Sequence, residues 1–510
     1  MKNYILKHST NFKNINIKNI FLIFFILANF YLYFGSVLLL ETFNVYFLIF
    51  FILSVTNVLI TLLLKTSFFN IYFNFYMWLG NFFFFSIHVI YFENKYNFGI
   101  GNFNFENTSH VKELYLLFIT INLAILVGTI ISYYFIDLEY KKIKYKFNSF
   151  CKKKKSYILL SLILLIIAIF ILNKYFIHFD YYYFASYTIH PILASFLKWF
   201  FLFGFTSIFC VLIDLEEKKN FIYQLFLISS IQEFLFYNSI LSRGCLFNSM
   251  AILIGLCAKK FKNFYYLRIF SFLFLIIFGL FLINFYILIY ERGGSNYENL
   301  KKYRNIEIKN NQSMFFNEFR LKNLATRISL KHDDISKHTI IFNMKEFKVR
   351  ANQIFFSFKN RIFGADSLMV LVGNENKSFK LINDALLEKY EPGKTSYFDE
   401  IRQKNKTKIN STNLTLPSLP GFLYYSGSKA FVFFMIILII FLMNFFEKLN
   451  ILLNSNIILT SLISQLLAYR LWHFGYAPSN SYKFFIAILF SVLIAYFFKF
   501  ALLRKKLIVK

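Results

Sequence analysis

Apolar residues fill most of this chain in blocks of about 20, and short polar stretches separate the blocks. An α-helix needs roughly 20 apolar residues to cross the hydrocarbon core of a bilayer, so each block has the length of one span. The blocks lie at 19–40, 43–64, 70–92, 113–136, 157–177, 196–214, 221–240, 245–258, 266–290, 421–446, 451–471 and 483–503. The pattern predicts an all-α, polytopic membrane bundle of about twelve transmembrane helices.

One long polar stretch interrupts the series and divides the chain into three parts. Residues 1–290 hold about nine blocks and are expected to form an N-terminal membrane bundle. Residues 291–420 form a single large loop, and 421–510 hold about three blocks of a C-terminal membrane bundle. Within the loop, 312–331 and 339–372 carry apolar residues at three- and four-residue spacing. That spacing indicates amphipathic helices lying near the membrane surface.

Lysine and arginine alternate between the short loops and so predict an orientation. The basic segments are 2–18, 137–156, 218–219, 259–262 and 504–510. The loops between them are poor in Lys and Arg, at 41–42, 93–112, 178–195 and 241–244. Cytoplasmic loops carry an excess of these residues. We therefore expect a multi-pass protein with both termini in the cytoplasm and the large loop outside it.

Composition agrees with the membrane interpretation. Hydrophobic residues make up 57% of the chain and charged residues 16%, which no ordinary soluble domain of this length shows. The net charge of +30 could indicate nucleic acid, but most of it lies in loops that flank spans, so no nucleic-acid partner is expected. The large loop holds 23 Lys and Arg against 14 Asp and Glu. This balance fits either a solvated surface or an anionic substrate.

Several familiar catalytic patterns are missing from the sequence. It contains no GxxxxGK[ST], HExxH, GxSxG or paired CxxC, and its four cysteines have neither disulfide nor metal-ligand spacing. Phosphate-loop ATPases, zinc proteases and hydrolases with a nucleophile elbow are therefore unsupported. We expect no metal and no cofactor.

Two charged residues near the predicted seventh span are candidates for chemistry. Arg243 lies in a tight outer turn, NSILSRGCLFN, where its fork of donors could bind phosphate oxygens bidentately. The alternative is an interfacial arginine that extends toward water. Glu233 lies earlier in the same span, and a carboxylate inside a membrane is a functional candidate. It could equally be a buried partner of a Lys, Tyr or Asn.

The large loop and the eleventh span supply further candidates. Arg361, Gly364 and Asp366 fall within an amphipathic helical pattern, where Arg361 and Asp366 could reach separate parts of one ligand or could be surface residues. His332 and His338 belong to the string HDDISKH, which could bind metal but is more typical of a solvated loop. Arg470 and His473 lie where the eleventh span leaves the membrane, at the level expected for Arg243 and the loop, in a catalytic or a structural role.

Three short motifs, in this order, resemble those of the O-antigen polymerases, the oligosaccharide repeat-unit polymerases of bacterial envelopes. They are SRG in a short outer turn, R-x-x-G-x-D-x-L in a large outer loop, and PG-x-L-YY-x-G before the next span. The resemblance covers the overall plan of the chain and about forty residues of local sequence. It implies a metal-independent, membrane-embedded glycosyltransferase at the periplasmic face of the bacterial inner membrane, acting on glycans linked to polyprenyl pyrophosphate.

The resemblance also suggests roles for individual residues. Arg243 and Arg361 match outer-face arginines that would bind the pyrophosphate, and Arg470 is a third candidate for that role. Asp366 matches an acidic position and, with His338, is a candidate base. The expected partners are the lipid-linked glycan and the bilayer, with a chain-length regulator and a flippase as further candidates. Three alternatives remain: an O-antigen ligase, whose family uses a His in the large loop, a glycan-lipid flippase, and a structural protein that anchors partners.

Overall fold

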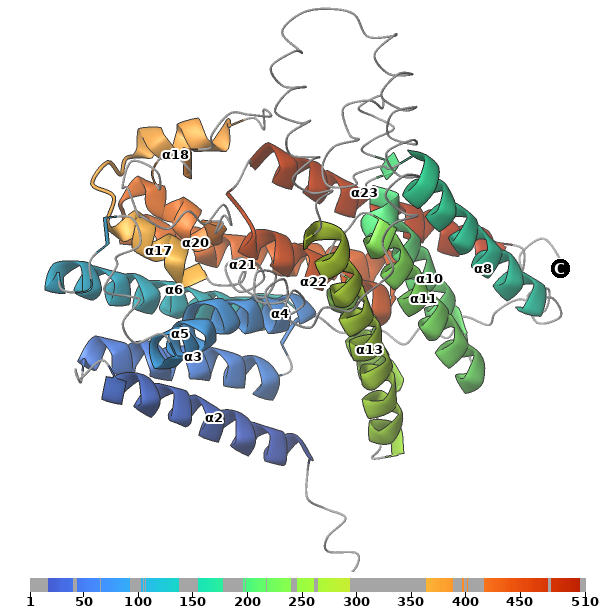
Figure 1. The fold of residues 1–510 in the computed structure, drawn as a ribbon, viewed down its shortest axis with the longest axis horizontal. Coiled ribbons are helices and arrows are strands. Elements are labelled where there is room, and N and C mark those ends of the chain that lie inside the picture. Colours follow the sequence, from blue (N-terminus) through green and yellow to red (C-terminus); the bar gives the residue numbers. More distant parts are fainter. Residues whose placement is uncertain are drawn as a thin grey trace, which may run out of the picture.

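A computed structural model gives the structure of the chain, and the residues it describes are mostly helical and contain no strand (Figure 1). The all-α class is therefore confirmed. The described residues are 17–39, 44–64, 66–91, 102–103, 105, 107–136, 155–177, 196–197, 199–216, 218–239, 245–260, 265–293, 364–388, 397–398, 401, 417–475 and 478–504.

A helix occurs in each predicted apolar block, and two further helices, α17 and α18, lie within the predicted large loop. Before the large loop they are α2 (Ile17–Leu39), α3 (Val45–Leu63), α4 (Phe68–Met77), η2 (Trp78–Phe83), α5 (Phe84–Tyr91), α6 (Thr108–Phe135), α8 (Lys155–Ile171), η4 (Leu172–Ile177), η7 (Phe200–Gly204), α10 (Phe205–Leu215), α11 (Lys219–Ser239), α12 (Cys245–Lys260) and α13 (Tyr265–Gly293). From the loop onward they are α17 (Gly364–Val372), α18 (Phe379–Leu386), α20 (Ser418–Leu423), η8 (Tyr424–Ser426), α21 (Lys429–Asn454), α22 (Ile457–Trp472) and α23 (Pro478–Arg504).

Three of these helices are long and apolar enough to cross a membrane: α6, α21 and the part of α23 from Ser481 to Ala501. Several shorter apolar helices accompany them. The chain is therefore a helical membrane protein, while the number of twelve spans stays a prediction.

The surface of α21 has the pattern that a lipid-facing helix requires. Side chains at every third or fourth position are exposed and apolar, namely Phe434, Leu438, Leu442, Phe445, Leu449 and Leu452. The opposite face is buried and includes Asn444 and Glu447. An apolar stripe that faces outward while polar groups face inward is stable in hydrocarbon and not in water.

Two predicted boundaries around α21 are wrong, and local backbone conformation explains both. The block 421–446 was expected to be one helix, but Gly427 adopts φ of 75°, which ends η8, and Ser428 then caps α21. At the other end Ser455 adopts φ of 46° and Asn456 caps α22, so α21 runs to Asn454 and not to 446. Apolar composition shows where a block lies but does not reveal turns of this kind within or beside it. Turn residues can be flanked by apolar residues on both sides.

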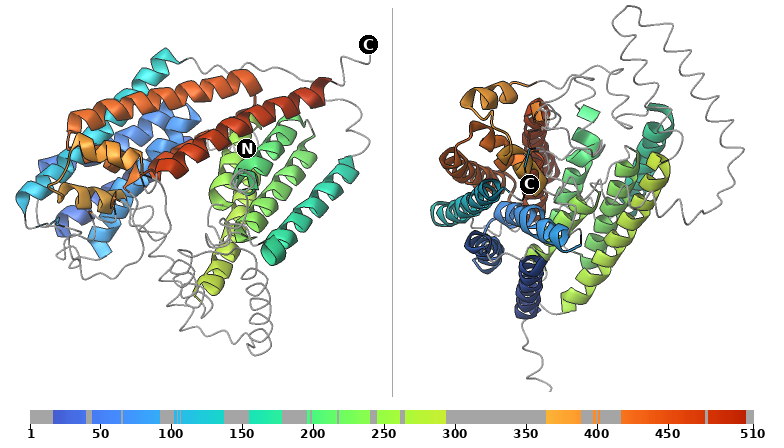
Figure 2. Two further views of the ribbon diagram at one scale, coloured as in Figure 1. Left: turned by 90° about the horizontal axis from the view of Figure 1, so that it is seen from above. Right: turned by 60° about the vertical axis from the view of Figure 1, so that its left-hand side comes forward.

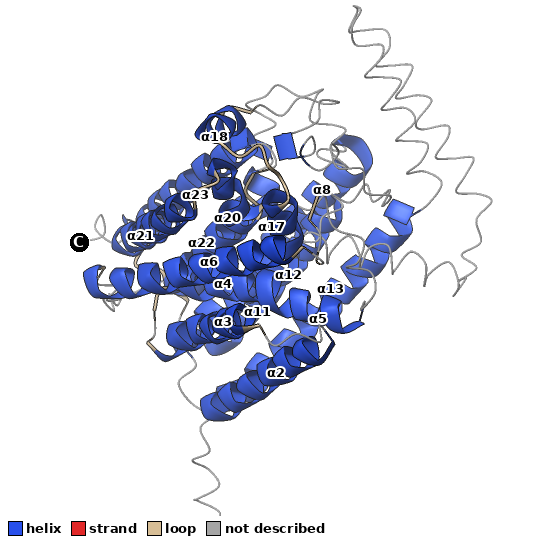
Figure 3. Cartoon of the chain, turned by 90° about the vertical axis from the view of Figure 1, so that its left-hand side faces the viewer, coloured by secondary structure: helices blue, strands red, loops and turns tan. Residues whose placement is uncertain are grey.

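Helix α22 lies at the centre of the bundle, where it packs against α4, α10, α12, α20, α21 and α23 (Figure 3). Thirteen of its sixteen residues are buried. Its polar side chains reach α4: Ser461 and the Tyr72 hydroxyl share a hydrogen bond of 2.7 Å, and Gln465 donates to the Tyr76 hydroxyl at 3.1 Å. Helices that precede and follow the large loop in the sequence therefore share one core. Interhelical hydrogen bonds of the kind found in membrane proteins hold α22 in that core.

Glu447 shows how a carboxylate can be buried here. Its oxygens accept from the backbone N–H groups of Phe68 at 3.1 Å and Phe69 at 2.8 Å, and from Ser464 Oγ at 2.8 Å. These N–H groups belong to the first turn of α4, where helix donors lack intrahelical partners. Glu447 therefore caps α4 from α21 and joins the two helices.

The helix ends fall into two groups at opposite ends of the bundle. Figure 2 shows α21 and α23 side by side, with α17 and α18 near the first residues of α21 and α23. At what we call the insert end, α17 and α18 lie beside the starts of α6 and α21 and the end of α22. At what we call the Lys259 end, α10 and α12 finish and α22 starts. This sorting agrees with the alternation of basic and neutral loops in the sequence.

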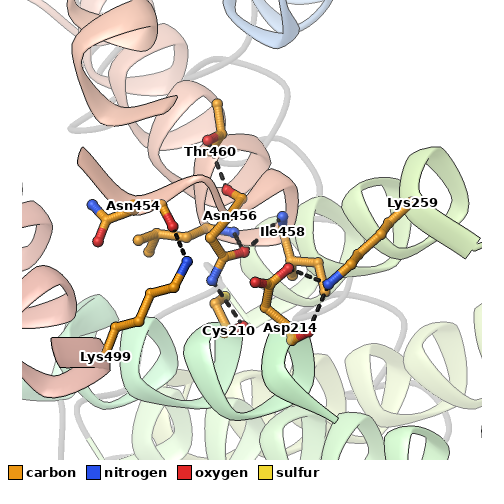
Figure 4. A network of polar contacts seen from close by, with 9 residues as sticks. Cys210, Asp214, Lys259, Asn454, Asn456, Ile458, Thr460 and Lys499 are labelled. Atoms are coloured by element: carbon orange, nitrogen blue, oxygen red, sulfur yellow. Dashed lines mark hydrogen bonds and ion pairs between the residues drawn. The ribbon is translucent and has the colours of Figure 1, made fainter. Parts of the chain in front are cut away.

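Polar contacts between helix ends hold the Lys259 end together (Figure 4). Lys259 on α12 forms an ion pair with Asp214 on α10. Asn456 donates from Nδ2 to the Cys210 carbonyl at 3.1 Å, and Lys499 donates to the Asn454 carbonyl. Lys499 gives a donor to the carbonyl of Asn454, the last residue of α21, where acceptors lack intrahelical partners. Asn456, the N-cap of α22, connects that end to α10.

Candidate functional site

The helix α17 brings the large loop into the protein interior. Its residues Ala365, Leu368, Met369 and Leu371 have no exposed surface. The prediction that 339–372 forms a surface amphipathic helix is therefore wrong for α17, and 339–363 lie outside the described residues. The three- and four-residue spacing is real, but the polar side of α17 is also covered by protein.

Gly364, the first residue of α17, packs without room for a side chain. A Cβ atom placed on it would lie 2.4 Å from Cη2 of Trp472, at the end of α22, and 3.0 Å from Oδ1 of Asn81 in η2. Both neighbours are buried. The motif R-x-x-G-x-D-x-L thus needs its glycine because the start of α17 meets two membrane helices here.

Asp366 lies in the first turn of α17 and is partly buried. A carboxylate in the first turn is stabilised by the positive end of the helix dipole. The close contact of Gly364 with Trp472 fixes this turn beside the end of α22. The structure therefore places the predicted acidic residue where helices from distant parts of the chain meet.

The last turn of α22 presents three kinds of side chain in different directions. Trp472 faces Gly364, while the His473 ring packs on Tyr469 with centroids 4.1 Å apart. The Arg470 guanidinium carbon lies 5.5 Å from the ring centre of Phe484 on α23. Arg470 and Trp472 are two residues apart and so point about 160° away from each other. Arg470 is thus at the predicted end of the bundle, but it stacks on α23 and not on the side that receives α17.

Aromatic residues connect this turn with the start of α12. Phe247 lies 5.3 Å from Tyr469 between ring centroids, and Tyr76 lies 6.0 Å from Tyr469. Phe247 is four residues after Arg243 in the sequence. The first turn of α12, which follows the SRG motif, is therefore packed against the same end of α22.

Glu233 lies in a buried polar cluster formed by η7, α10, α11 and α12. It accepts from Thr206 Oγ1 and from Asn248 Nδ2, the latter at 3.0 Å. The carbonyl of Leu202, in the π-helical segment η7, accepts from Asn248 at 2.8 Å and from the Tyr237 hydroxyl at 3.1 Å. The hydrogen bonds of Glu233 connect the start of α12 to α10. These contacts fit the alternative in which Glu233 is a buried hydrogen-bond partner.

A second cluster at the insert end was not predicted from the sequence. The Glu113 carboxylate in α6 accepts from Lys429 Nζ at 2.5 Å and from the Tyr424 hydroxyl. Lys377, which follows α17, has its ammonium 5.0 Å from the ring centre of Tyr424. Burial lowers the pKa of Lys377, and the charge of Glu113 opposes that shift. One member of this cluster was visible in the sequence, because Tyr424 is the first tyrosine of the motif PG-x-L-YY-x-G.

Four predicted residues lie outside the described part of the chain: Arg243, Arg361, His332 and His338. Their roles stay predictions. Among the described residues, no group of three or more His, Cys, Asp and Glu could hold a metal ion. The HDDISKH string belongs to the part that is not described.

Comparison with family models, with curated proteins and with solved structures gave no match for this chain.

Proposed function

We propose that the chain is a membrane-embedded glycosyltransferase that polymerises oligosaccharide repeat units linked to polyprenyl pyrophosphate at the periplasmic face of the bacterial inner membrane. The observation that supports this most is that two of the motifs, R-x-x-G-x-D-x-L and PG-x-L-YY-x-G, meet the end of α22 and the first turn of α12 at one end of the bundle. Gly364 touches Trp472, a Cβ on Gly421 would lie 3.1 Å from Leu371 Cδ1, and Phe247 contacts the same turn of α22. Segments that are distant in sequence and close in space are typical of an active site.

The proposed reaction forms one glycosidic bond and breaks one bond to phosphate. A sugar hydroxyl of one lipid-linked unit attacks the anomeric carbon of another, whose bond to the pyrophosphate oxygen breaks. Polyprenyl pyrophosphate leaves with the electron pair and thus gains negative charge. Arg243 and Arg361 are the proposed donors to that charge, with Arg470 as the third, because a preorganised cation stabilises the transition state more than the ground state.

The hydroxyl proton has to be transferred to a base. Asp366 is the first candidate, since it lies in the turn of α17 that packs against α22. His338 is the second. A positioned base accelerates such a step by roughly 10²–10⁴-fold. No metal enters the proposed reaction, because arginines would carry out the charge stabilisation.

A glycan-lipid flippase is the second candidate function, and one observation favours it. Transporters place charged groups within their spans, and here Glu233 and Glu447 are buried inside helices. Both are bound by hydrogen-bond donors at helix ends or neighbouring helices, and this arrangement suits a structural role better than a moving charge.

Gel profiling of surface glycan after deletion of the gene separates the candidates. A polymerase is expected to leave a single repeat unit on the lipid acceptor and to remove the ladder. Loss of all glycan from the acceptor, with polymer still on the carrier, would indicate the ligase. Carrier-linked units that accumulate on the cytoplasmic face would indicate the flippase. Turnover by purified protein with lipid-linked units, in the presence and absence of a chelator, then tests metal independence.

A further inference from the structure

The end of α17 opposite Asp366 is buried, and its carbonyl groups need donors. A helix leaves its last four carbonyls without intrahelical partners, and a buried carbonyl without a donor is costly. Gly373 N–H donates to Met369 O at 3.0 Å, and Asn374 N–H donates to Leu371 O at 3.2 Å. The Lys377 ammonium then donates to Leu371 O at 3.3 Å and to Val372 O at 3.2 Å. A single lysine thus serves the last two residues of the helix.

Lys377 is itself held by the membrane helices. Its ammonium lies over the Tyr424 ring, a favourable cation–π position. The Tyr424 hydroxyl donates to Glu113 in the first turns of α6, and Glu113 also binds Lys429 in the first turn of α21. The neighbouring residue contributes as well, because Ser378 N–H donates to Tyr425 O at 2.8 Å. The end of α17 is therefore tied to both α6 and α21.

The position of Lys377 affects Asp366 because α17 is short and rigid. Val372 is six positions after Asp366, which is about 9 Å along a helix. The first residue of α17 has no free space around it, since Gly364 packs against Trp472. A shift at the Lys377 end must therefore move or unwind the first turn.

We propose that Lys377 is a positioning residue that clamps the end of α17 and so sets the place of Asp366 at the insert end. The consequence for catalysis rests on the proposed function, but the clamp itself does not. Lys377→Met removes the cation and keeps much of the apolar stem. Lys377→Arg keeps a charged donor for the two carbonyls. Lys380→Met is the matched control, because Lys380 is exposed on α18 three residues later.

Amide hydrogen exchange of the α17 amides measures the clamp without reference to activity. Loss of hydrogen bonds from a charged donor is expected to speed exchange in Lys377→Met on the order of tenfold or more. Lys377→Arg should restore most of the protection, and Lys380→Met should match the wild type. Exchange of α22 amides serves as the internal control for folding. Wild-type exchange of α17 in Lys377→Met would overturn the proposal, whatever the turnover.

Turnover of lipid-linked units tests the link to Asp366. Misplacing Asp366 should lower kcat with little change in KM, and Lys377→Met should add little loss in an Asp366→Asn background, since residues that act as a unit are not additive. Suppose that Asp366→Asn inactivates the protein. Faster amide exchange together with full turnover in Lys377→Met would then overturn the positioning role. If Asp366→Asn is itself fully active while exchange is faster, the clamp stands and the proposed role of Asp366 fails.

Discussion

The two ends of the bundle are built from similar groups and differ in what those groups hold. At the Lys259 end, Lys259, Asp214 and Asn456 connect membrane helices to one another. At the insert end, Lys377 and Tyr424 connect a helix of the large loop to the bundle. The first end needs only to keep helices together, and the second also fixes α17 and the residue Asp366 on it. Under the proposed function, chemistry belongs to the insert end and the Lys259 end has a structural role.

The largest expected effect concerns the side of the membrane on which the insert end and the Lys259 end each lie. A reporter that is active only outside the cytoplasm should be active when fused near residue 350 and silent when fused near residue 150, because basic loops are retained inside. Fusions within the basic tail after residue 504 provide a silent control. Activity at 150 with silence at 350 would reverse the orientation and remove every proposed role at the insert end.

The next largest effect is expected from the proposed catalytic pair. Arg361→Ala and Asp366→Asn should each lower turnover by about 10²–10⁴-fold while the amount of protein stays normal. The double variant should be little worse than the worse single variant if both act in one step. Asp384→Asn, an exposed residue on α18, is the control and should behave as wild type. Normal glycan ladders in both single variants would show that neither residue takes part in the reaction.

How much the sequence could predict also differs between the two ends. Apolar block length located the helices, since the bilayer imposes one length on them all. It could not predict that α17 is buried, because burial of α17 depends on Gly364 meeting Trp472, more than a hundred residues away. Tertiary contacts of this kind leave no local pattern.

The site was predictable only in part for the same reason. Asp366 stood out as a charged residue within a motif. Glu113 and Lys377 belong to none of the sequence motifs, and only their contacts with Tyr424 give them a role.

A smaller effect is expected from filling the close contact at Gly364. Gly364→Ala puts a methyl group against the Trp472 ring, and such overpacking costs typically about 1–3 kcal/mol. Thermal unfolding in detergent should shift down, and polymer length should fall as α17 moves. Trp472→Phe in the same chain should recover part of both, since the smaller ring frees the space that the methyl group needs.

The matched control for this change lies on α13. A methyl group added at Gly279 would have no atom of the described chain within 4 Å, so Gly279→Ala should be neutral or stabilising by up to about 1 kcal/mol. Equal behaviour of Gly364→Ala and Gly279→Ala would contradict the tight contact between α17 and α22.

The smallest effect on activity is expected at the Lys259 end. Lys259→Met leaves the carboxylate of Asp214, which has 8% exposure, without its ion pair, so unfolding should become easier by about 1–3 kcal/mol. Asp214→Asn in the same chain removes the leftover charge and should restore part of the loss, which a double-mutant cycle measures. Turnover per folded molecule should remain that of the wild type in all three variants, because the main contacts of α17 with the described helices are with α6, α20 and η2. A drop in kcat at normal stability would show that the two ends are coupled and that the Lys259 end takes part in the reaction cycle.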